Sequence, residues 1–431
     1  MMRNTMKLTM TAALLATAGV AAAAPTYIHA GRLIAVPGQA PRGASTIVVD
    51  GGRIVAVRDG HVAPPTGAVA IDLRDQTVLP GLIDSHVHLA SDRGGEAGLL
   101  SFVREEPQMN ALEAQMNGMK TLRAGFTTVR NLGDEGATLA LREAIKRGWV
   151  QGPRIVDAAS PISTTGGHMD GRGGLNDDLV AHLPSPENLC DGVDACRKVV
   201  RRQIDRGADV IKFATTGGVN SGTGLATRMN EDEARALVDT AHAYGRKVAV
   251  HAHGADGIKL ALRAGADSIE HGTVMDDDIL RAMKKQGTYY VPTLSTVNGY
   301  LERLAANPNA YAPDVKKQID WRIGITGLSL AKAVPAGVKI AFGTDAGVSK
   351  HGRNADEFEL MVKYGMSPVE AIKAATVNAA DLLGLASEVG TIEAGKSADI
   401  IAVAGDPLSD VRVLKSVGFV MARGALVSSG S

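Results

Sequence analysis

The sequence has no net charge and few aromatic residues, and each shortage excludes a class of partner. Lysine plus arginine and aspartate plus glutamate both number 46. The chain therefore lacks the basic excess with which proteins bind nucleic acid or anionic membranes. Aromatic residues make up only 3% of the 431 residues, which argues against the stacking platforms that hold single-stranded nucleic acid. A small-molecule substrate, with no nucleic acid, is the expected partner.

Long apolar runs are also missing, except at the N-terminus. Arg3 and Lys7 precede an apolar stretch at 10–20, and small residues follow at 21–24, which is the pattern of a secretory signal. A retained membrane anchor is the alternative, but the apolar run is shorter than the roughly 20 residues of a spanning helix. We therefore expect residues 1–23 to be a signal peptide, the mature chain to be periplasmic or secreted, and no stable membrane anchor to remain.

The chain has only two cysteines, Cys190 and Cys196. Neither has cysteine or histidine partners at zinc-finger spacing, so a structural metal site is not expected there. In an oxidising compartment the pair is expected to form a disulfide that closes a short loop, and a pair of free thiols is the alternative. Thiol catalysis is not expected, because both cysteines lie outside the strand ends described below.

What the sequence does have is 50 glycines, 45% apolar residues and a regular alternation of strand and helix patterns. The expected strands are GLIDSHVH, FTTVRNLG, PRIVDAAS, DVIKFATT, KVAVHAHG, DSIEHGT, TYYVPTL and KIAFGTDAG. Each is followed by a segment able to form a helix, and Asn230 with Glu233 and Ser367 with Glu370 have capping-box spacing. This pattern is typical of a (β/α)₈ TIM barrel, expected here over residues 80–387.

The two ends of the chain have strand patterns instead. Residues 25–79 contain a Gly-Gly hairpin in TIVVDGGRIVAVRDG, and strand-like segments return at 388–431. We expect these two segments to pair as a small composite β-sandwich beside the barrel. An open doubly wound sheet is the alternative architecture, but it would have a glycine-rich phosphate loop after its first strand, and none is present there.

Ligand-type residues stand where the apolar strands end. These are His86, His88, Lys212, His251, His253, His271 and Asp345. The C-terminal ends of barrel strands converge on one mouth, so residues far apart in the sequence become neighbours there. Imidazole and carboxylate groups at one mouth predict a site for Zn²⁺ or a similar divalent ion.

Lys212 is the unusual member, because Val210, Ile211 and Phe213 surround it and a buried ammonium ion is unfavourable. One alternative is a lysine that reaches solvent at the strand end. We expect instead a neutral amine that has reacted with carbon dioxide. The resulting carbamate would bridge two metal ions, one held by His86, His88 and Asp345, and the other by His251 and His271.

The motifs together resemble those of the amidohydrolase superfamily. They are VLPGLIDSHVH, the fourth-strand lysine, VHAHG, IEHGT, FGTDAG and VGTIEAGKSADI. The resemblance spans essentially the whole mature chain, and it is closest to the binuclear branch of Xaa-Pro and Xaa-Arg dipeptidases and the amidases that hydrolyse ochratoxin A. It implies two divalent ions, typically zinc, with His86, His88, N6-carboxylated Lys212, His251, His271 and Asp345 as ligands. It also implies a homo-oligomer, with an octamer as the candidate assembly.

The resemblance puts the fifth-strand ligand on His251 and leaves His253 for the substrate carbonyl. We expect Asp345 to pass a proton from the metal-bridging hydroxide to the departing amine, and His253 to stabilise the oxyanion. His168, on a glycine-rich loop after the third strand, is either a substrate contact or a solvated residue. Arg228 and Arg172 are candidate partners of a substrate carboxylate, with surface solvation as the alternative for each.

The expected reaction is the hydrolysis of a linear amide: a dipeptide or an N-acyl amino acid, cleaved as a carboxypeptidase does, with ochratoxin A as one candidate. A cyclic amide hydrolase or a mononuclear deaminase on the same fold is the alternative. Such enzymes usually have a glutamate shortly after the fifth-strand histidine, whereas this chain has His251-Ala252-His253-Gly254. A non-catalytic scaffold is not expected, because such relatives usually lose ligands and every expected ligand is present.

Overall fold

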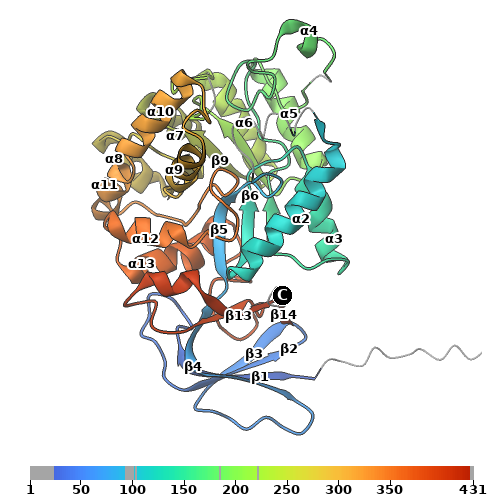
Figure 1. Cartoon of the computed structure of the whole chain (residues 1–431), viewed down its shortest axis with the longest axis vertical. Coiled ribbons are helices and arrows are strands. Elements are labelled where there is room, and N and C mark those ends of the chain that lie inside the picture. The colour runs from blue at the N-terminus through green and yellow to red at the C-terminus, as the bar shows by residue number, and fades with distance from the viewer. Residues whose placement is uncertain (1–23, 93–100, 102–103, 184–185, 221–222, 428–431) are drawn as a thin grey trace, which may run out of the picture.

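A computed structural model describes residues 24–92, 101, 104–183, 186–220 and 223–427, so the expected signal peptide at 1–23 lies outside the described residues. Figure 1 shows two parts. Strands without helices form one end of the molecule, and parallel strands surrounded by helices form the other. None of the described helices is long and apolar enough to cross a membrane.

The first part is a single sheet of seven strands, built from both ends of the chain. The strands are β1 (Thr26–Leu33), β2 (Ser45–Asp50), β3 (Arg53–Asp59), β4 (Val69–Pro80), β12 (Ile400–Val403), β13 (Val417–Ala422) and β14 (Ala425–Leu426). Their order is β14-β13-β12-β4-β1-β2-β3. The two ends join where β12 pairs antiparallel with β4, with Ile400 opposite Pro80. The expected pairing of the chain ends is therefore confirmed, but the second layer that a sandwich requires is not.

The expected Gly-Gly hairpin connects β2 and β3. Asp50 pairs with Arg53, and Gly51 and Gly52 between them have φ angles of 53° and 79°. Two successive positive φ angles are the requirement of a type I′ turn, which matches the right-handed twist of paired strands. Glycine adopts these angles without the clash that a side chain would introduce.

The second part contains seven parallel strands, which lie in two sheets. One sheet has the order β5-β6-β7 and the other β11-β10-β9-β8. The strands are β5 (Leu82–Val87), β6 (Phe126–Asn131), β7 (Arg154–Asp157), β8 (Val210–Ala214), β9 (Lys247–Ala252), β10 (Ser268–His271) and β11 (Tyr289–Val291). All neighbours within these sheets run parallel.

The eighth expected strand, KIAFGTDAG, is too irregular to form a regular ladder. Isolated parallel bridges join its Ile340 to Tyr290 of β11 and Ala346 to Val87 of β5, and a third such bridge, between Ile162 and Phe213, connects the segment after β7 to β8. The backbone at Asp345 has a positive φ of 57°, a conformation incompatible with an extended strand. The expected single barrel sheet is thus replaced by two sheets joined by bridges.

Helices follow most of these strands, as the alternation predicted. They are α2 (Pro107–Arg123), α3 (Ala137–Lys146), α4 (Asp177–Val180), α5 (Val193–Asp205), α6 (Glu231–Ala243), α7 (Ala255–Ala264), α8 (Asp277–Gln286), α9 (Thr296–Ala306), α10 (Pro313–Gly324), α11 (Leu328–Ala336), α12 (Asp356–Lys363), α13 (Pro368–Lys373) and α14 (Ala379–Leu382), with a π-helical turn η1 (Ala374–Asn378) and a 3₁₀ turn η2 (Val411–Lys415). Both expected capping boxes are present, at the starts of α6 and α13. The main core lies between the parallel strands and these helices.

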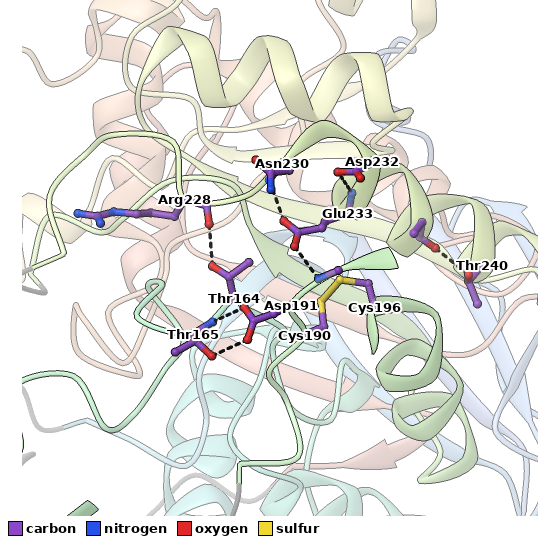
Figure 2. Close-up of a disulfide and its surroundings, with 12 residues drawn as sticks. Thr164, Thr165, Cys190, Asp191, Cys196, Arg228, Asn230, Asp232, Glu233 and Thr240 are labelled. Carbon is purple, nitrogen blue, oxygen red and sulfur yellow. Dashed lines mark hydrogen bonds between the residues drawn. A yellow bond between two sulfur atoms is a disulfide. The ribbon is translucent and has the colours of Figure 1, made fainter. Parts of the chain in front are cut away.

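The expected disulfide between Cys190 and Cys196 is present, and it ties a short loop to the start of α5 (Figure 2). Both cysteines are buried. In the same loop Asp191 accepts a hydrogen bond of 2.7 Å from the Thr165 hydroxyl, and the Gly192 amide donates to Glu233 at the start of α6. The crosslinked loop therefore contacts the segment that carries His168.

Replacing both cysteines by serine is expected to destabilise the protein by about 2 kcal/mol, because a crosslink over so short a loop removes a modest amount of chain entropy from the unfolded state. Thermal unfolding would measure the difference. Reduced wild-type protein is the control, and it should unfold like the double variant. A double variant as stable as the oxidised wild type, together with two titratable thiols in the wild type, would contradict the disulfide.

Candidate metal centre

The C-terminal ends of the parallel strands surround a cavity of about 420 Å³. All eight residues predicted for the site line it: His86, His88, His168, Lys212, His251, His253, His271 and Asp345. They come from β5, β8, β9 and β10 or the residue that directly follows β5 or β9, from the loop after β7, and from the eighth strand segment. The tertiary structure thus brings together residues that are up to 259 positions apart in the sequence (345 minus 86).

One group at the cavity floor consists of His86, His88 and Asp345. The Oδ1 atom of Asp345 lies 3.5 Å from His86 Nε2 and 3.3 Å from His88 Nε2. One ligand atom from each of the three residues lies within 4.8 Å of the others, which is close enough for a shared metal ion. Gly343 allows this approach, because a Cβ there would lie 3.0 Å from the Cβ of His86.

A second group consists of His251, His253 and His271, whose ligand atoms also lie within 4.8 Å of one another. The ring centroids of His251 and His271 are 4.5 Å apart. The ring of His271 is also only 5.1 Å from that of His86 in the first group. The two groups are therefore adjacent and form one cluster. Five imidazoles and one carboxylate are a donor set that suits a divalent transition metal.

Lys212 is buried beside this cluster, with 1% of its surface exposed. Its Nζ atom lies 3.5 Å from His86 Nε2, and no carboxylate of a described residue lies within ion-pair distance of it. Burial lowers the pKa of Lys212 to about 8, although Glu270 and Asp345 act in the opposite direction. The uncharged amine is therefore far more accessible here than in an ordinary lysine.

Hydrogen bonds to the protein determine which imidazole nitrogens are free. The Nδ1 atom of His86 is 2.8 Å from the Glu270 carboxylate, and that of His88 is 2.8 Å from the Gly133 carbonyl. The Nε2 atom of His251 is 3.2 Å from the Gly217 carbonyl. Carbonyl and carboxylate oxygens only accept, so each of these nitrogens carries the proton and the other nitrogen keeps a free lone pair.

The other two imidazoles have hydroxyl partners. His253 Nδ1 lies 2.7 Å from the Thr273 hydroxyl, and His271 Nδ1 lies 2.8 Å from that of Thr293. A hydroxyl can donate or accept, so these contacts allow either tautomer. The structure therefore keeps His253 near enough to be a ligand while leaving its Nε2 free to act as a donor.

Sequence reasoning missed the ion pair between Glu270 and Arg130 behind His86. Glu270 is fully buried and accepts hydrogen bonds of 2.8 Å from both His86 and Arg130. Burial acts to raise the pKa of Glu270, but Arg130 and His86 outweigh it and lower the pKa to about 2. Both residues stand inside fully buried strands, SIEH and FTTVRN. The same anomaly that marked Lys212 could have identified them.

Burial also controls the ionisation of the cluster. It lowers the pKa of His86 to about 4, with the charge of Lys212 acting in the same direction. It lowers the pKa values of His251, His253 and His271 well below their ordinary value. Burial raises the pKa of Asp345, but the neighbouring His86 and His88 prevail and lower it to about 2. Neutral imidazoles and an ionised carboxylate are the protonation states in which these groups bind metals.

His168 packs directly on the cluster. Its ring stacks on that of His251, with the centroids 4.2 Å apart. Gly218 makes room for it, because a Cβ there would lie 2.0 Å from the His168 ring. Burial lowers the pKa of His168 to about 4. Of the two interpretations of this loop residue, the structure favours a site residue over a solvated one.

The two arginines proposed as carboxylate partners do not line the cavity. Arg172 forms an ion pair with Asp170 at 3.0 Å, and Arg228 donates to the Thr223 carbonyl from an exposed position. Among the described residues, the lysine and arginine side chains that do line the cavity are Lys212, Arg303 and Arg322. The two arginines among them come from α9 and α10, in a part of the chain where the sequence pattern indicated only helices.

Known proteins resemble the chain over nearly its whole length. The family model described as "Amidohydrolase family" matches residues 77–427. Ochratoxinase from Aspergillus niger is 31% identical over 408 residues, which cover 90% of this chain and 83% of that protein. A crystal structure of a Xaa-Pro dipeptidase with bound methionine in its active site is 40% identical, with a TM-score of 0.87, and covers 94% of this chain and 99% of that one.

A prolidase solved in complex with N-methylphosphonate-L-proline is 33% identical, with a TM-score of 0.84, over 93% of this chain and 99% of that one. The family model covers all of the parallel strands, together with the end of β4 and the strands β12, β13 and β14 of the terminal sheet. The site geometry, the family match and these relatives agree on the same class of chemistry. The chain belongs to the amidohydrolase family and is a hydrolase that acts on carbon–nitrogen bonds.

Proposed function

We propose that the protein is a binuclear metal-dependent amidohydrolase that cleaves a linear amide with a free carboxylate on its leaving amino acid. The observation that carries this proposal is Lys212, a buried amine that has no carboxylate partner among the described residues and lies 3.5 Å from a histidine of the cluster. As a carbamate it would change from an unfavourable buried cation into an anionic oxygen ligand. The charge of Lys212 contributes to lowering the pKa values of His86 in the first group and of His251 and His271 in the second. Lys212 therefore lies near both groups, which supports a bridging position.

The donor atoms fit two divalent ions, for which zinc is our proposal. His86, His88 and Asp345 would hold one ion, His251 and His271 the other, and N6-carboxylated Lys212 both. Bound ions of this kind polarise a carbonyl and lower the pKa of water to roughly 7. The lone pairs of His86, His88 and His251 are directed by their protein partners, which supports this choice of ligands.

Asp345 is the proposed catalytic base and acid. Its carboxylate is ionised because its pKa is about 2, so it can accept a proton from the attacking water and return it to the departing amine. His253 is the proposed partner of the substrate carbonyl. When Thr273 donates its hydroxyl hydrogen to His253 Nδ1, the Nε2–H of His253 becomes a donor to the developing oxyanion. His168, stacked on His251, would contact the substrate from the cavity wall.

The substrate class comes from the relatives. The dipeptidase and prolidase structures, and the ochratoxinase, are named for reactions that release an amino acid from an amide bond. We therefore propose dipeptides, N-acyl amino acids and ochratoxin A as candidates, the last giving ochratoxin alpha and phenylalanine. A cavity of about 420 Å³ is in the range of pockets that enclose ligands of this size.

The test is a screen of these three substrate classes with zinc-loaded and chelator-treated protein, together with metal analysis. We expect release of a free amino acid that requires metal, and two divalent ions per chain. Turnover restricted to cyclic amides or aminopurines, with one ion per chain, would favour the deaminase instead. A protein that binds no metal and cleaves nothing would be a scaffold.

Glu270 is expected to support the cluster through His86. Replacing Glu270 by glutamine removes the charge that pairs with both His86 and Arg130, and zinc affinity should fall roughly 10- to 100-fold. Competition with a chelator measures the affinity. Glu233→Gln is the matched control, because Glu233 is a buried carboxylate that accepts hydrogen bonds from the Gly192 and Asn230 backbone amides and does not line the cavity. Unchanged zinc affinity in Glu270→Gln would show that the pair does not support the metal site.

The proposal also covers the compartment, the architecture and the assembly of the protein. We infer a periplasmic or secreted protein from the expected signal peptide, and the disulfide supports an oxidising compartment. We also propose a closed (β/α)₈ barrel over residues 80–387, supported by the bridges that link the two parallel sheets. The terminal segments 25–79 and 388–431 would form the accessory domain. A homo-oligomer, with an octamer as the candidate assembly, is proposed from the family resemblance alone.

A further inference from the structure

Arg322 is a buried cation that the proposed reaction does not use. It lies near the end of α10, with 3% of its surface exposed. It lines the same cavity as the proposed metal ligands. Its positive charge is one of the causes that lower the pKa of His253, second to burial. Arg322 is therefore close to the imidazole that we assign to the substrate carbonyl.

The Arg322 guanidinium has no counter-ion in the part of the chain that the structure describes. Among the described residues, no carboxylate lies within ion-pair distance of it, and its one hydrogen bond goes from Nη1 to the Thr326 hydroxyl at 3.1 Å. The last carbonyls of α10 supply only a partial negative charge. Arg130, the other fully buried arginine, shows the contrast. It donates to Ser85, Ser268 and Glu270, so its charge and donors are satisfied.

A buried guanidinium that lacks a partner is unfavourable unless an anion binds it. Such an anion would bind in the cavity that Arg322 lines. Tyr300 of α9 lines the same space. Burial raises the pKa of Tyr300, the charge of Asp345 raises it further, and Arg322 acts in the opposite direction. The Tyr300 hydroxyl is thus within electrostatic reach of both the proposed catalytic carboxylate and the buried guanidinium.

We propose that Arg322 binds the free carboxylate of the substrate's leaving amino acid, with the Tyr300 hydroxyl as a second donor. This inference rests on the proposed function. In a dipeptide or N-acyl amino acid the terminal carboxylate is one α-carbon away from the scissile nitrogen. An anion site beside His253 and Asp345 is therefore where that carboxylate falls when the amide lies over the cluster. The planar guanidinium matches a carboxylate with two parallel hydrogen bonds.

Arg303 is the competing cation in this cavity. It is only partly buried, and its contacts, with the Gly347 carbonyl and the Tyr311 hydroxyl, are both 3.5 Å long. Water can hydrate a partly exposed guanidinium, so Arg303 needs no bound anion to satisfy its charge. The burial of Arg322 distinguishes the two, and Arg303→Gln is therefore the matched comparison.

The test measures binding of 3-phenylpropanoate and 3-phenylpropan-1-ol, which lack an amide, to the zinc-loaded full-length protein by calorimetry. We expect the wild type to prefer the carboxylate on the order of 100-fold. Arg322→Gln should abolish most of this preference, and Arg303→Gln should keep it. Retention of the preference in Arg322→Gln, its loss in Arg303→Gln, or its absence in the wild type would each overturn the proposal.

Two further measurements distinguish a wrong role for Arg322 from a variant that does not fold and from a wrong proposed function. Arg322→Lys keeps the charge without the planar fork, so it should keep part of the preference, and it serves as the test if the glutamine variant does not fold. On a cleaved dipeptide, Arg322→Gln should raise KM far more than it lowers kcat. Carboxylate binding through Arg322 without cleavage of any amide would mean that the proposed function had failed. Cleavage that does not depend on Arg322 would mean that only this inference had.

Discussion

Replacing Lys212 by alanine is expected to lower kcat/KM by about 10³-fold or more and to reduce the metal content below two ions per chain. The physical reason is the loss of the only proposed ligand shared by both ions, since metal polarisation of the carbonyl and water contributes several kcal/mol. Activity assays and metal analysis of the purified variant measure both effects. Lys212→Arg should be equally inactive, because a guanidinium cannot form the carbamate.

Two controls distinguish a role of Lys212 as a metal ligand from a role as a structural cation. Lys247 stands at the start of β9, where its Nζ atom donates to the Asp381 carbonyl, and Lys247→Ala should keep both activity and metal. Acetate or propionate should partly restore Lys212→Ala, because a small carboxylate can occupy the space of the carbamate. A Lys212→Ala variant that kept two metal ions and full activity would show that the carbamate is wrong.

Replacing Asp345 by asparagine is expected to lower kcat by on the order of 10³-fold, within the range that a positioned general base contributes. Asparagine keeps the shape and one oxygen of the side chain but cannot accept the proton. The loss should therefore exceed any loss of metal, and metal analysis beside the kinetics distinguishes the two roles. The residual activity should rise steadily with pH, because hydroxide replaces the missing base.

Asp381→Asn is the matched control for Asp345→Asn. Asp381 contacts Tyr289, Lys247 and Lys339 outside the cavity of the proposed metal ligands, so the change should leave kcat unaltered. If Asp345→Asn kept a tenth or more of the wild-type kcat with both ions bound, the proton transfer would have to be assigned elsewhere. If it lost both ions, Asp345 would act mainly as a ligand.

Much of the candidate site could be predicted because its residues violate the local pattern. Histidines at the ends of apolar strands and a lysine inside one are costly to place in a core, so their presence indicates a function. The same reasoning could be extended to Glu270 and Arg130, since both are charged residues inside strands of the parallel sheets that are fully buried. It could not find Arg322, because DWRIG in α10 reads as an ordinary helical segment. Only the packing of α10 against the cavity buries this arginine.

Irregular backbone geometry is the second feature of the site that the sequence pattern did not predict. The eighth strand segment was expected to be regular, yet Asp345 and His271 both have positive φ angles, of 57° and 70°. Non-glycine residues in this conformation are uncommon and occur where the surrounding structure demands them. Both residues belong to the cluster. The backbone is thus distorted where it positions ligands, and a periodicity argument has no signal for such a distortion.

The strand and helix alternation, the disulfide pair, the capping boxes and the set of candidate ligands could all be predicted from the amino-acid sequence. These are local properties, because periodicity, turn residues and residue type depend on near neighbours in the chain. Only the folded structure shows which nitrogen is free in His86, His88 and His251, that Arg322 reaches the cavity, and that the paired chain ends form one sheet and not two layers. Those properties depend on contacts between residues far apart in the sequence, and only the folded packing creates them.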